Sequence, residues 1–137
     1  HLDVPALDNS GLPIAVSKKV VTQLLQQQLG FNGLVFTDAL NMKGINSAVD
    51  SPALAAFLAG ADVLLMPLHL EKAISAIKTS YANGDITEAR LATSVKKILS
   101  GKYALGLHQN KAVKRTGNPL KNTFYDIVYV IVESSSF

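Results

Sequence analysis

Two short apolar runs, separated by segments of helical periodicity, constrain the fold of this chain more than any other feature. Residues 33–37 and residues 62–66 are short, almost wholly apolar and rich in strand-forming side chains. Runs of this kind are typical of strands buried on both faces, as in a parallel sheet. Because helical segments lie before, between and after them, the order of elements predicts an α/β fold whose strands run parallel.

The helical segments are recognised by apolar side chains that recur every three or four residues. We expect the first helix to be capped by Ser17 and closed by Gly30. Asp85 and Glu88 have the spacing of a capping box at the start of the last helix, which should end near Gly106. The predicted helices cover residues 17–29, 52–59 and 70–82 and a last stretch from after Asp85 to near Gly106, and residues 1–16 and 38–50 are expected to be loops.

Length and composition limit how much of a fold this chain can complete. Its 137 residues, nearly half of them hydrophobic, suffice for one packed core. A closed (β/α)8 barrel needs eight strands in about 250 residues, so two strands cannot close one. The composition changes after Gly106: residues 111–121 are basic and polar like a linker, and residues 124–132 alternate loosely like a single strand. We therefore expect a domain boundary after residue 107, with residues 108–137 forming a linker, a divergent tail or the start of another domain.

Charge and residue usage exclude several classes of protein. The formal net charge is +3, but residues 1–110 carry nine basic against eight acidic side chains, which argues against a nucleic-acid partner. The chain has no cysteine, so disulfides and thiolate metal sites are ruled out. The longest apolar runs, such as residues 63–68, are too short to span a bilayer, and we recognise no signal peptide. These features leave the oligomeric state open, and the location open between the bacterial cytoplasm and exported compartments.

Asp38 is the side chain whose position alone suggests chemistry. It follows residues 33–37 directly, at the carboxyl end of that predicted strand. In parallel α/β folds this edge of the sheet is where ligands bind and catalytic side chains gather. An acid at this position can equally well cap a turn or the next helix, so both interpretations stay open. Asp62, in contrast, precedes its strand and is expected at the opposite edge, where side chains stabilise the fold.

Residues 30–42 carry the most specific pattern in the chain. They read Gly-Phe-Asn-Gly-Leu-Val-Phe-Thr-Asp-Ala-Leu-Asn-Met. This segment resembles the nucleophile segment of glycoside hydrolase family 3, which reads Gly-Phe-x-Gly, two or three aliphatic residues, Ser/Thr-Asp, then Asp/Ala-Leu-x-Met. Ala39 departs from the commoner second Asp of that segment. Further similarity extends over residues 1–107, in His1 with Val4–Asp8, in Ala59–Leu65, in Gly84–Ile86 and in Lys102–Leu107.

The resemblance implies both a fold and a mechanism. It implies that residues 1–107 are the last strand–helix units of a (β/α)8 TIM barrel, and so a partial barrel of the α/β class. In this family the aspartate after Ser/Thr is the nucleophile of a retaining glycosidase, which here would be Asp38. The Leu40-x-Met42 ending favours the β-N-acetylhexosaminidase branch, whose substrates carry a terminal β-linked N-acetylhexosamine. His1 and Met42 would contact that sugar, and neither a metal ion nor an organic cofactor is implied.

Part of the machinery that the resemblance implies is missing. Retaining hydrolysis needs a second group that protonates the leaving oxygen. In the hexosaminidase branch this group lies in a Lys-His-x-x-Gly-His-Gly-Asp pattern, which these residues do not contain. We therefore expect the chain to be inactive by itself. His1 is alternatively an ordinary loop residue and Met42 a core side chain, and His69 and His108, near helix ends, are expected to be solvated.

Two functions of other classes remain open. A receiver domain of a phosphorelay also has an Asp at the end of a buried strand, followed soon by a Met and a Gly, as Met42 and Gly44 follow here. Such a domain needs an acidic pair after its first strand to hold Mg²⁺, and Asp3 and Asp8 follow no predicted strand. The second alternative is a non-catalytic, sugar-binding remnant of a hydrolase, which the missing acid/base pattern favours.

Overall fold

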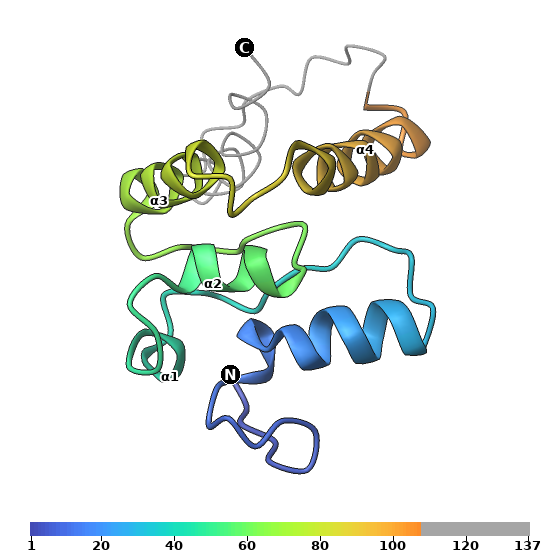
Figure 1. Ribbon diagram of the computed structural model, residues 1–137. Coiled ribbons are helices and arrows are strands. Elements are labelled where there is room, and N and C mark those ends of the chain that lie inside the picture. Colours follow the sequence, from blue (N-terminus) through green and yellow to red (C-terminus); the bar gives the residue numbers. More distant parts are fainter. Residues whose placement is uncertain (108–137) are drawn as a thin grey trace, which may run out of the picture.

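The computed structural model describes residues 1–107, and the linker and strand predicted within residues 108–137 lie outside this part. The described residues form six helical elements and one pair of extended segments (Figure 1). None of these helices is both long enough and apolar enough to cross a bilayer. In chain order the helical elements are η1 (Ile14–Val16), η2 (Lys19–Gln28), α1 (Lys43–Asn46), α2 (Pro52–Ala59), α3 (Leu70–Ala82) and α4 (Glu88–Ala104).

Three of the four predicted helices form at the predicted places. α2 begins at Pro52, which suits a first helical position because proline has no N–H to leave unpaired. It ends at Gly60, where φ is +122° and an added Cβ would lie 2.7 Å from Thr22 Oγ1. Glycine suits this position because the conformation is strained for other residues and the space is already filled. α3 and α4 likewise agree with the spacing of their apolar side chains.

The first predicted helix forms with a different geometry. η2 is a π-helix rather than an α-helix, and the Leu29 N–H bonds the carbonyl five residues earlier at 2.9 Å. Its start agrees with the prediction, because Ser17 Oγ accepts a hydrogen bond from the Val20 N–H at 3.2 Å. Thr22 and Gln26 donate to the two backbone carbonyls at the end of α2, at 2.6 and 2.9 Å. The wider turns of η2 thus keep two polar side chains over the end of α2, which apolar spacing does not reveal.

The prediction of two full strands, over residues 33–37 and 62–66, is wrong in length and right in direction. In the described residues, the two segments form one parallel bridge, between Phe36 and Val63. The N–H of Thr37 bonds the Val63 carbonyl at 3.0 Å beside that bridge. This parallel pairing is that of neighbouring strands in an α/β sheet.

Side chains occupy the positions where a longer ladder would continue. Before the bridge, the Asp62 carboxylate accepts a hydrogen bond from the Val35 N–H at 3.0 Å. After the bridge, Thr37 Oγ1 accepts one from the Leu65 N–H at 2.9 Å. Because these side chains satisfy N–H groups that backbone carbonyls would otherwise take, the regular pairing stops after one bridge.

The two segments are also less buried than their composition predicts. Val63 and Leu64 are buried, but Phe36 is 57% exposed and Met66 is 41% exposed. Within residues 1–107 each segment has a paired neighbour on one side only, so the outer side chains have little to pack against. Burial on both faces would require further strands and helices around them.

The hydrophobic core lies around α2, whose short alanine side chains let neighbouring elements approach closely. Figure 1 shows α2 between η2 on one side and α3 and α4 on the other, and α2 contacts η1, η2 and α3. The stretch 38–50, predicted as a loop, contains α1 and contributes the buried side chains Leu40 and Ile45. The stretch 1–16, also predicted as a loop, contains η1. The core consists of Val16, Leu40, Ile45, Ala53, Ala56, Phe57, Ala61, Leu64, Ala73 and Ile86.

A buried carboxylate joins α4 to the extended segments. Asp62 is 1% exposed. It accepts hydrogen bonds from a backbone N–H, a hydroxyl and an ammonium group, those of Val35, Ser94 and Lys97. The Arg90 guanidinium lies 3.6 Å from Asp62 Oδ1, the oxygen that also accepts from Ser94. These contacts agree with the structural role that the sequence predicts for Asp62.

Arg90 extends this network to α2. Its Nη2 atom donates to the carbonyls of Phe57 and Ala61, at 3.1 and 2.7 Å. Its guanidinium carbon also lies 4.3 Å from the centroid of the Phe57 ring, within the range of a cation–π contact. Burial lowers the pKa of Arg90, and the neighbouring Asp62 carboxylate opposes that shift. One side chain therefore links the core helix, the extended segment and α4.

α4 starts two residues later than the predicted capping box requires. Its N-cap is Thr87, whose Oγ1 accepts a hydrogen bond from the Arg90 N–H at 3.2 Å. Asp85, the predicted cap, instead accepts a hydrogen bond from the Ser80 hydroxyl at 3.4 Å. The turn after α3 is the cause, because Gly84 has a φ of +85° and the Asp85 N–H bonds the Ser80 carbonyl to close α3.

A second carboxylate holds the N-terminal stretch. Asp8 accepts hydrogen bonds from the Ser17 hydroxyl and from the Ser10 N–H. The hydrogen bond from Ser17 is the main cause of the lowered pKa of Asp8; partial burial opposes it, and Ser10 and the charge of Lys19 add to it. Since Ser17 also caps η2, this contact joins residues 1–16 to that helix.

Replacing Asp62 with Ala should lower the free energy of unfolding by about 3 kcal/mol, because Lys97 and Arg90 lose the buried carboxylate that they share. Urea unfolding followed by circular dichroism measures this change. The matched control is Asp3→Ala at an exposed carboxylate, which should change the free energy by less than about 0.5 kcal/mol. Equal effects of the two substitutions would contradict the role of Asp62.

Asp8 should make the fold sensitive to acid. Because its carboxyl pKa is lowered in the folded chain, its stabilisation is complete above the unfolded value of about 3.9. That stabilisation is lost as the pH falls through the folded pKa. Thermal unfolding between pH 2 and pH 6 should therefore depend less steeply on pH in Asp8→Asn than in the wild type. Identical pH profiles for both proteins would show that this carboxylate contributes nothing.

Candidate active site

Asp38 stands at the carboxyl end of the extended segment that contains Phe36 and Thr37. The Thr37 N–H bonds the Val63 carbonyl, so the backbone is fixed up to the residue before Asp38. The Asp38 side chain is exposed, and its Oδ1 accepts a hydrogen bond from the Ala39 N–H at 2.7 Å. Asp38 therefore lies at the edge of the parallel pair where the sequence predicts a reactive carboxylate. In the described residues no hydrogen bond or ion pair joins it to a second titratable side chain.

His1 reaches the same segment from the start of the chain. Its Nε2 atom lies 3.0 Å from the Ala39 carbonyl oxygen, across 38 positions of sequence. Its Nδ1 atom is buried and has no hydrogen-bond partner within residues 1–107. The predicted contact of His1 with a sugar stays a prediction; what the structure adds is a contact with the residue after Asp38.

Met42 bonds the same Ala39 carbonyl through its backbone. Its N–H bonds the Ala39 carbonyl oxygen at 3.3 Å, and its side chain is 42% exposed. The side chain is thus too exposed for a fully packed core residue. The three residues that the sequence singles out, His1, Asp38 and Met42, all contact the backbone of Ala39.

The turn after Asp38 is braced by residues that sequence reasoning missed. Leu40 is buried, and its N–H bonds the Leu65 carbonyl at 2.8 Å, which anchors the turn to the second extended segment. The Asn46 amide donates to the carbonyls of Leu40 and Met42, both at 2.8 Å. No spacing in the sequence predicts this role, because Asn46 bonds backbone groups that α1 brings within reach only after folding.

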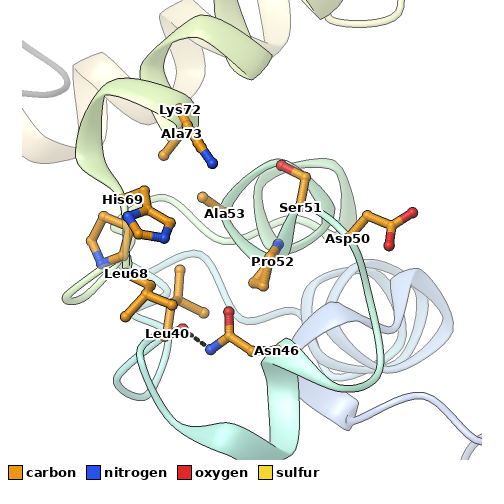
Figure 2. A pocket seen from close by; sticks show the side chains of 11 residues that line it. Leu40, Asn46, Asp50, Ser51, Pro52, Ala53, Leu68, His69, Lys72 and Ala73 are labelled. Atoms are coloured by element: carbon orange, nitrogen blue, oxygen red, sulfur yellow. Dashed lines mark hydrogen bonds between the residues drawn. The ribbon is translucent and has the colours of Figure 1, made fainter.

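A shallow pocket of about 90 Å³ lies beside this turn rather than around Asp38 (Figure 2). It is small against the roughly 300–1,000 Å³ of most ligand sites. Neither His1, Asp38 nor Met42 is among its lining residues, so we do not assign the sugar site to it. The lining comes from the turn, the starts of α2 and α3 and the segment before α3: Leu40, Asn46, Asp50, Ser51, Pro52, Ala53, Pro67, Leu68, His69, Lys72 and Ala73.

The other histidine and acidic side chains of the described residues form no metal site. His69 is exposed at the N-terminus of α3, as predicted, and faces this pocket (Figure 2). His108 lies outside the described residues. Within residues 1–107 there is no cluster of three or more histidine and acidic side chains that could hold a metal ion.

Comparison with known proteins extends the sequence resemblance. Residues 1–100 match the profile of the family described as glycosyl hydrolase family 3 N terminal domain. A β-N-acetylglucosaminidase/β-glucosidase of Cellulomonas fimi is 34% identical over 112 residues, which cover 80% of this chain and 20% of that protein. β-Hexosaminidase A of Pseudoalteromonas piscicida is 30% identical over 127 residues, covering 77% of this chain and 21% of that protein.

Solved structures give the same result. The family 3 β-N-acetylglucosaminidase of Paenibacillus sp. str. FPU-7 superposes with a TM-score of 0.73 and 29% identity, over 92% of this chain and 26% of that chain. CbsA of Thermotoga neapolitana gives a TM-score of 0.69 at 29% identity, over 77% of this chain and 25% of that chain. The chain thus spans about a fifth to a quarter of the length of these relatives. It belongs to glycosyl hydrolase family 3, and residues 1–100 match the N-terminal domain of that family.

Proposed function

We propose that residues 1–107 are the last strand–helix units of a retaining glycosidase that releases terminal β-linked N-acetylhexosamine. The observation that carries the proposal is the exposed Asp38 carboxylate at the carboxyl end of a parallel pair. The turn that follows it is held by the side chains of His1 and Asn46 and by the backbone hydrogen bond of Leu40. Carboxyl ends of parallel strands are where barrel enzymes hold their catalytic groups. Membership of family 3 and the names of the relatives support the reaction class.

The exposed outer side of the paired segments supports a partial (β/α)8 barrel. The pair has the parallel direction that a barrel needs, and helices both connect and follow its two members. Phe36 and Met66 are large apolar side chains left exposed there. Further strand–helix units on this side would cover them, as expected for a part of a larger barrel. Residues 108–137 would be a linker, a divergent tail or the start of another domain.

The proposed chemistry proceeds in two displacements. In the first, a lone pair of the Asp38 carboxylate forms a bond with the anomeric carbon while the bond to the leaving oxygen breaks and that oxygen takes a proton from an acid. In the second, water attacks the anomeric carbon, gives its proton to the same group, and releases Asp38. The acid/base group would come from sequence outside this chain, because these 137 residues lack the Lys-His-x-x-Gly-His-Gly-Asp pattern that carries it in the hexosaminidase branch.

The proposed substrate preference depends on Met42 and on the relatives. Met42 is partly exposed three positions after Ala39, which bonds Asp38, and this suits a side chain that lines the sugar subsite. Two of the relatives are named for N-acetylglucosaminides or hexosaminides. The natural partner of the protein would therefore be a carbohydrate with a terminal N-acetylhexosamine.

Replacing Asp38 with Asn should lower kcat of the intact protein that carries these residues by about 1,000-fold or more, because an amide cannot act as the nucleophile. Hydrolysis of 4-nitrophenyl N-acetyl-β-glucosaminide measures the rate. The control is Asp50→Asn, an exposed acid close to the same turn, which should leave kcat within about twofold. The nucleophile assignment is wrong if Asp38→Asn keeps a near-normal kcat and an unchanged melting temperature.

The purified 137-residue chain should not turn over the same aryl glycoside, because it lacks the acid/base group that protonates the leaving oxygen and then deprotonates the attacking water. Turnover by this chain above the buffer rate would contradict the proposal that the acid/base group lies elsewhere. Binding of N-acetylglucosamine without turnover by the intact protein would favour the alternative of a non-catalytic remnant.

A further inference from the structure

We propose that His1 is a positioning residue that holds the Asp38 nucleophile through the backbone of Ala39, a role that rests on the proposed glycosidase function. Ala39 is bonded on both of its polar backbone groups. Its N–H donates to Asp38 Oδ1 at 2.7 Å, and its carbonyl oxygen lies 3.0 Å from His1 Nε2. A rotation of the Ala39 backbone would therefore move the hydrogen bond that orients the carboxylate.

The protonation of the imidazole follows from its partner. A carbonyl oxygen only accepts hydrogen bonds, so the contact requires the proton to be on Nε2. The other nitrogen, Nδ1, is buried and unpartnered among the described residues, so it is not presented to a ligand in the space beside Asp38. With Nε2 engaged and Nδ1 covered, the ring has no free polar atom for a sugar hydroxyl. The hydrogen bond of the ring is therefore made to the backbone of the protein.

The surroundings of His1 keep the ring in this place. The side chain is half-buried and lies against Gly44, where an added Cβ would be 4.0 Å from His1 Cβ. The carbonyl of Leu2, the next residue, accepts a hydrogen bond from the Ile14 N–H at 2.9 Å. His1 thus lies against both Ala39 and Gly44 of α1, and the backbone of the next residue is held by the first residue of η1.

Asn46 offers a matched comparison within the same turn. Its amide bonds the carbonyls of Leu40 and Met42, which lie further along the chain from Asp38, and among the described residues it makes no hydrogen bond to Ala39. Loss of Asn46 should loosen the turn as a whole, whereas loss of His1 should release the residue that carries the carboxylate contact. The two substitutions therefore separate general loosening from positioning of Asp38.

The experiment uses the intact protein and a 5-fluoro N-acetylglucosaminyl fluoride, a slow substrate that leaves the sugar esterified to the nucleophile. Mass spectrometry identifies the labelled residue, and the labelling rate reports the first displacement. We expect His1→Ala to label Asp38 about 100-fold more slowly, because small misplacements of a reacting group have effects of this size. His1→Gln, whose amide N–H can replace that of Nε2, should recover most of the rate, and Asn46→Ala should lose less than about tenfold.

Binding of an aryl thioglycoside of N-acetylglucosamine, measured by calorimetry, separates positioning from sugar contact. A positioning role leaves its Kd within about twofold in His1→Ala, because only the reacting group has moved. A raised Kd with an unchanged labelling rate would mean that His1 contacts the sugar, and would overturn the proposal. So would equal losses in His1→Ala and Asn46→Ala.

The labelling experiment also distinguishes a wrong assignment of the Asp38 nucleophile from a wrong role of His1. If the wild-type protein is labelled at another residue, or not at all, the assignment of Asp38 is wrong and the role of His1 is wrong with it. If the wild type is labelled at Asp38 and His1→Ala is labelled at the same rate, only the role of His1 is overturned.

Discussion

The buried carboxylate of Asp62 is the interaction on which the rest of the structure most depends. It accepts a hydrogen bond from the Val35 N–H in place of a backbone carbonyl. It also accepts hydrogen bonds from Ser94 and Lys97 of α4 and forms an ion pair with Arg90 of the same helix. A carboxylate that is 1% exposed would be costly without partners. Here its partners come from one helix and one extended segment, so that the charge is neutralised only when both are in place. Burial of this charge therefore selects one arrangement of α4 against the paired segments.

The two ends of the paired segments do different work. At the end where the pair begins, the Asp62 side chain bonds the backbone and is itself buried from solvent. At the end where the pair finishes, Thr37 caps the ladder with its hydroxyl, and Asp38 is exposed beyond it. At both ends a side-chain oxygen accepts the hydrogen bond that a backbone carbonyl would accept in a longer sheet. Only the end at Asp38 has an exposed carboxylate. This separation is the one expected for parallel α/β folds, with stability at one edge and ligand contacts at the other.

The turn after Asp38 owes its shape to side chains that bond backbone carbonyls. His1 bonds Ala39, and Asn46 bonds Leu40 and Met42, while the Leu40 side chain is buried in the core. A turn without regular secondary structure would otherwise leave these polar groups to water and be free to move. The contacts that hold this turn thus include two between residues distant in sequence, that of His1 with Ala39 and that of Leu40 with Leu65. Such contacts are also those that a carboxylate substitution at Asp38 should leave intact.

The sequence by itself determined the places of the four longer helices, the direction of the paired segments, the family and the position of Asp38. These depend on local spacing and on a dense motif: apolar periodicity identifies α2, α3 and α4, and residues 30–42 carry the family pattern. Only the tertiary structure decided the length of the pairing, the π-geometry of η2, the start of α4 at Thr87 and the contacts of His1 and Asn46. Each of these depends on a hydrogen bond between groups whose proximity is set by folding. Local patterns predict where a polar side chain lies along an element, but not which distant carbonyl or N–H will meet it.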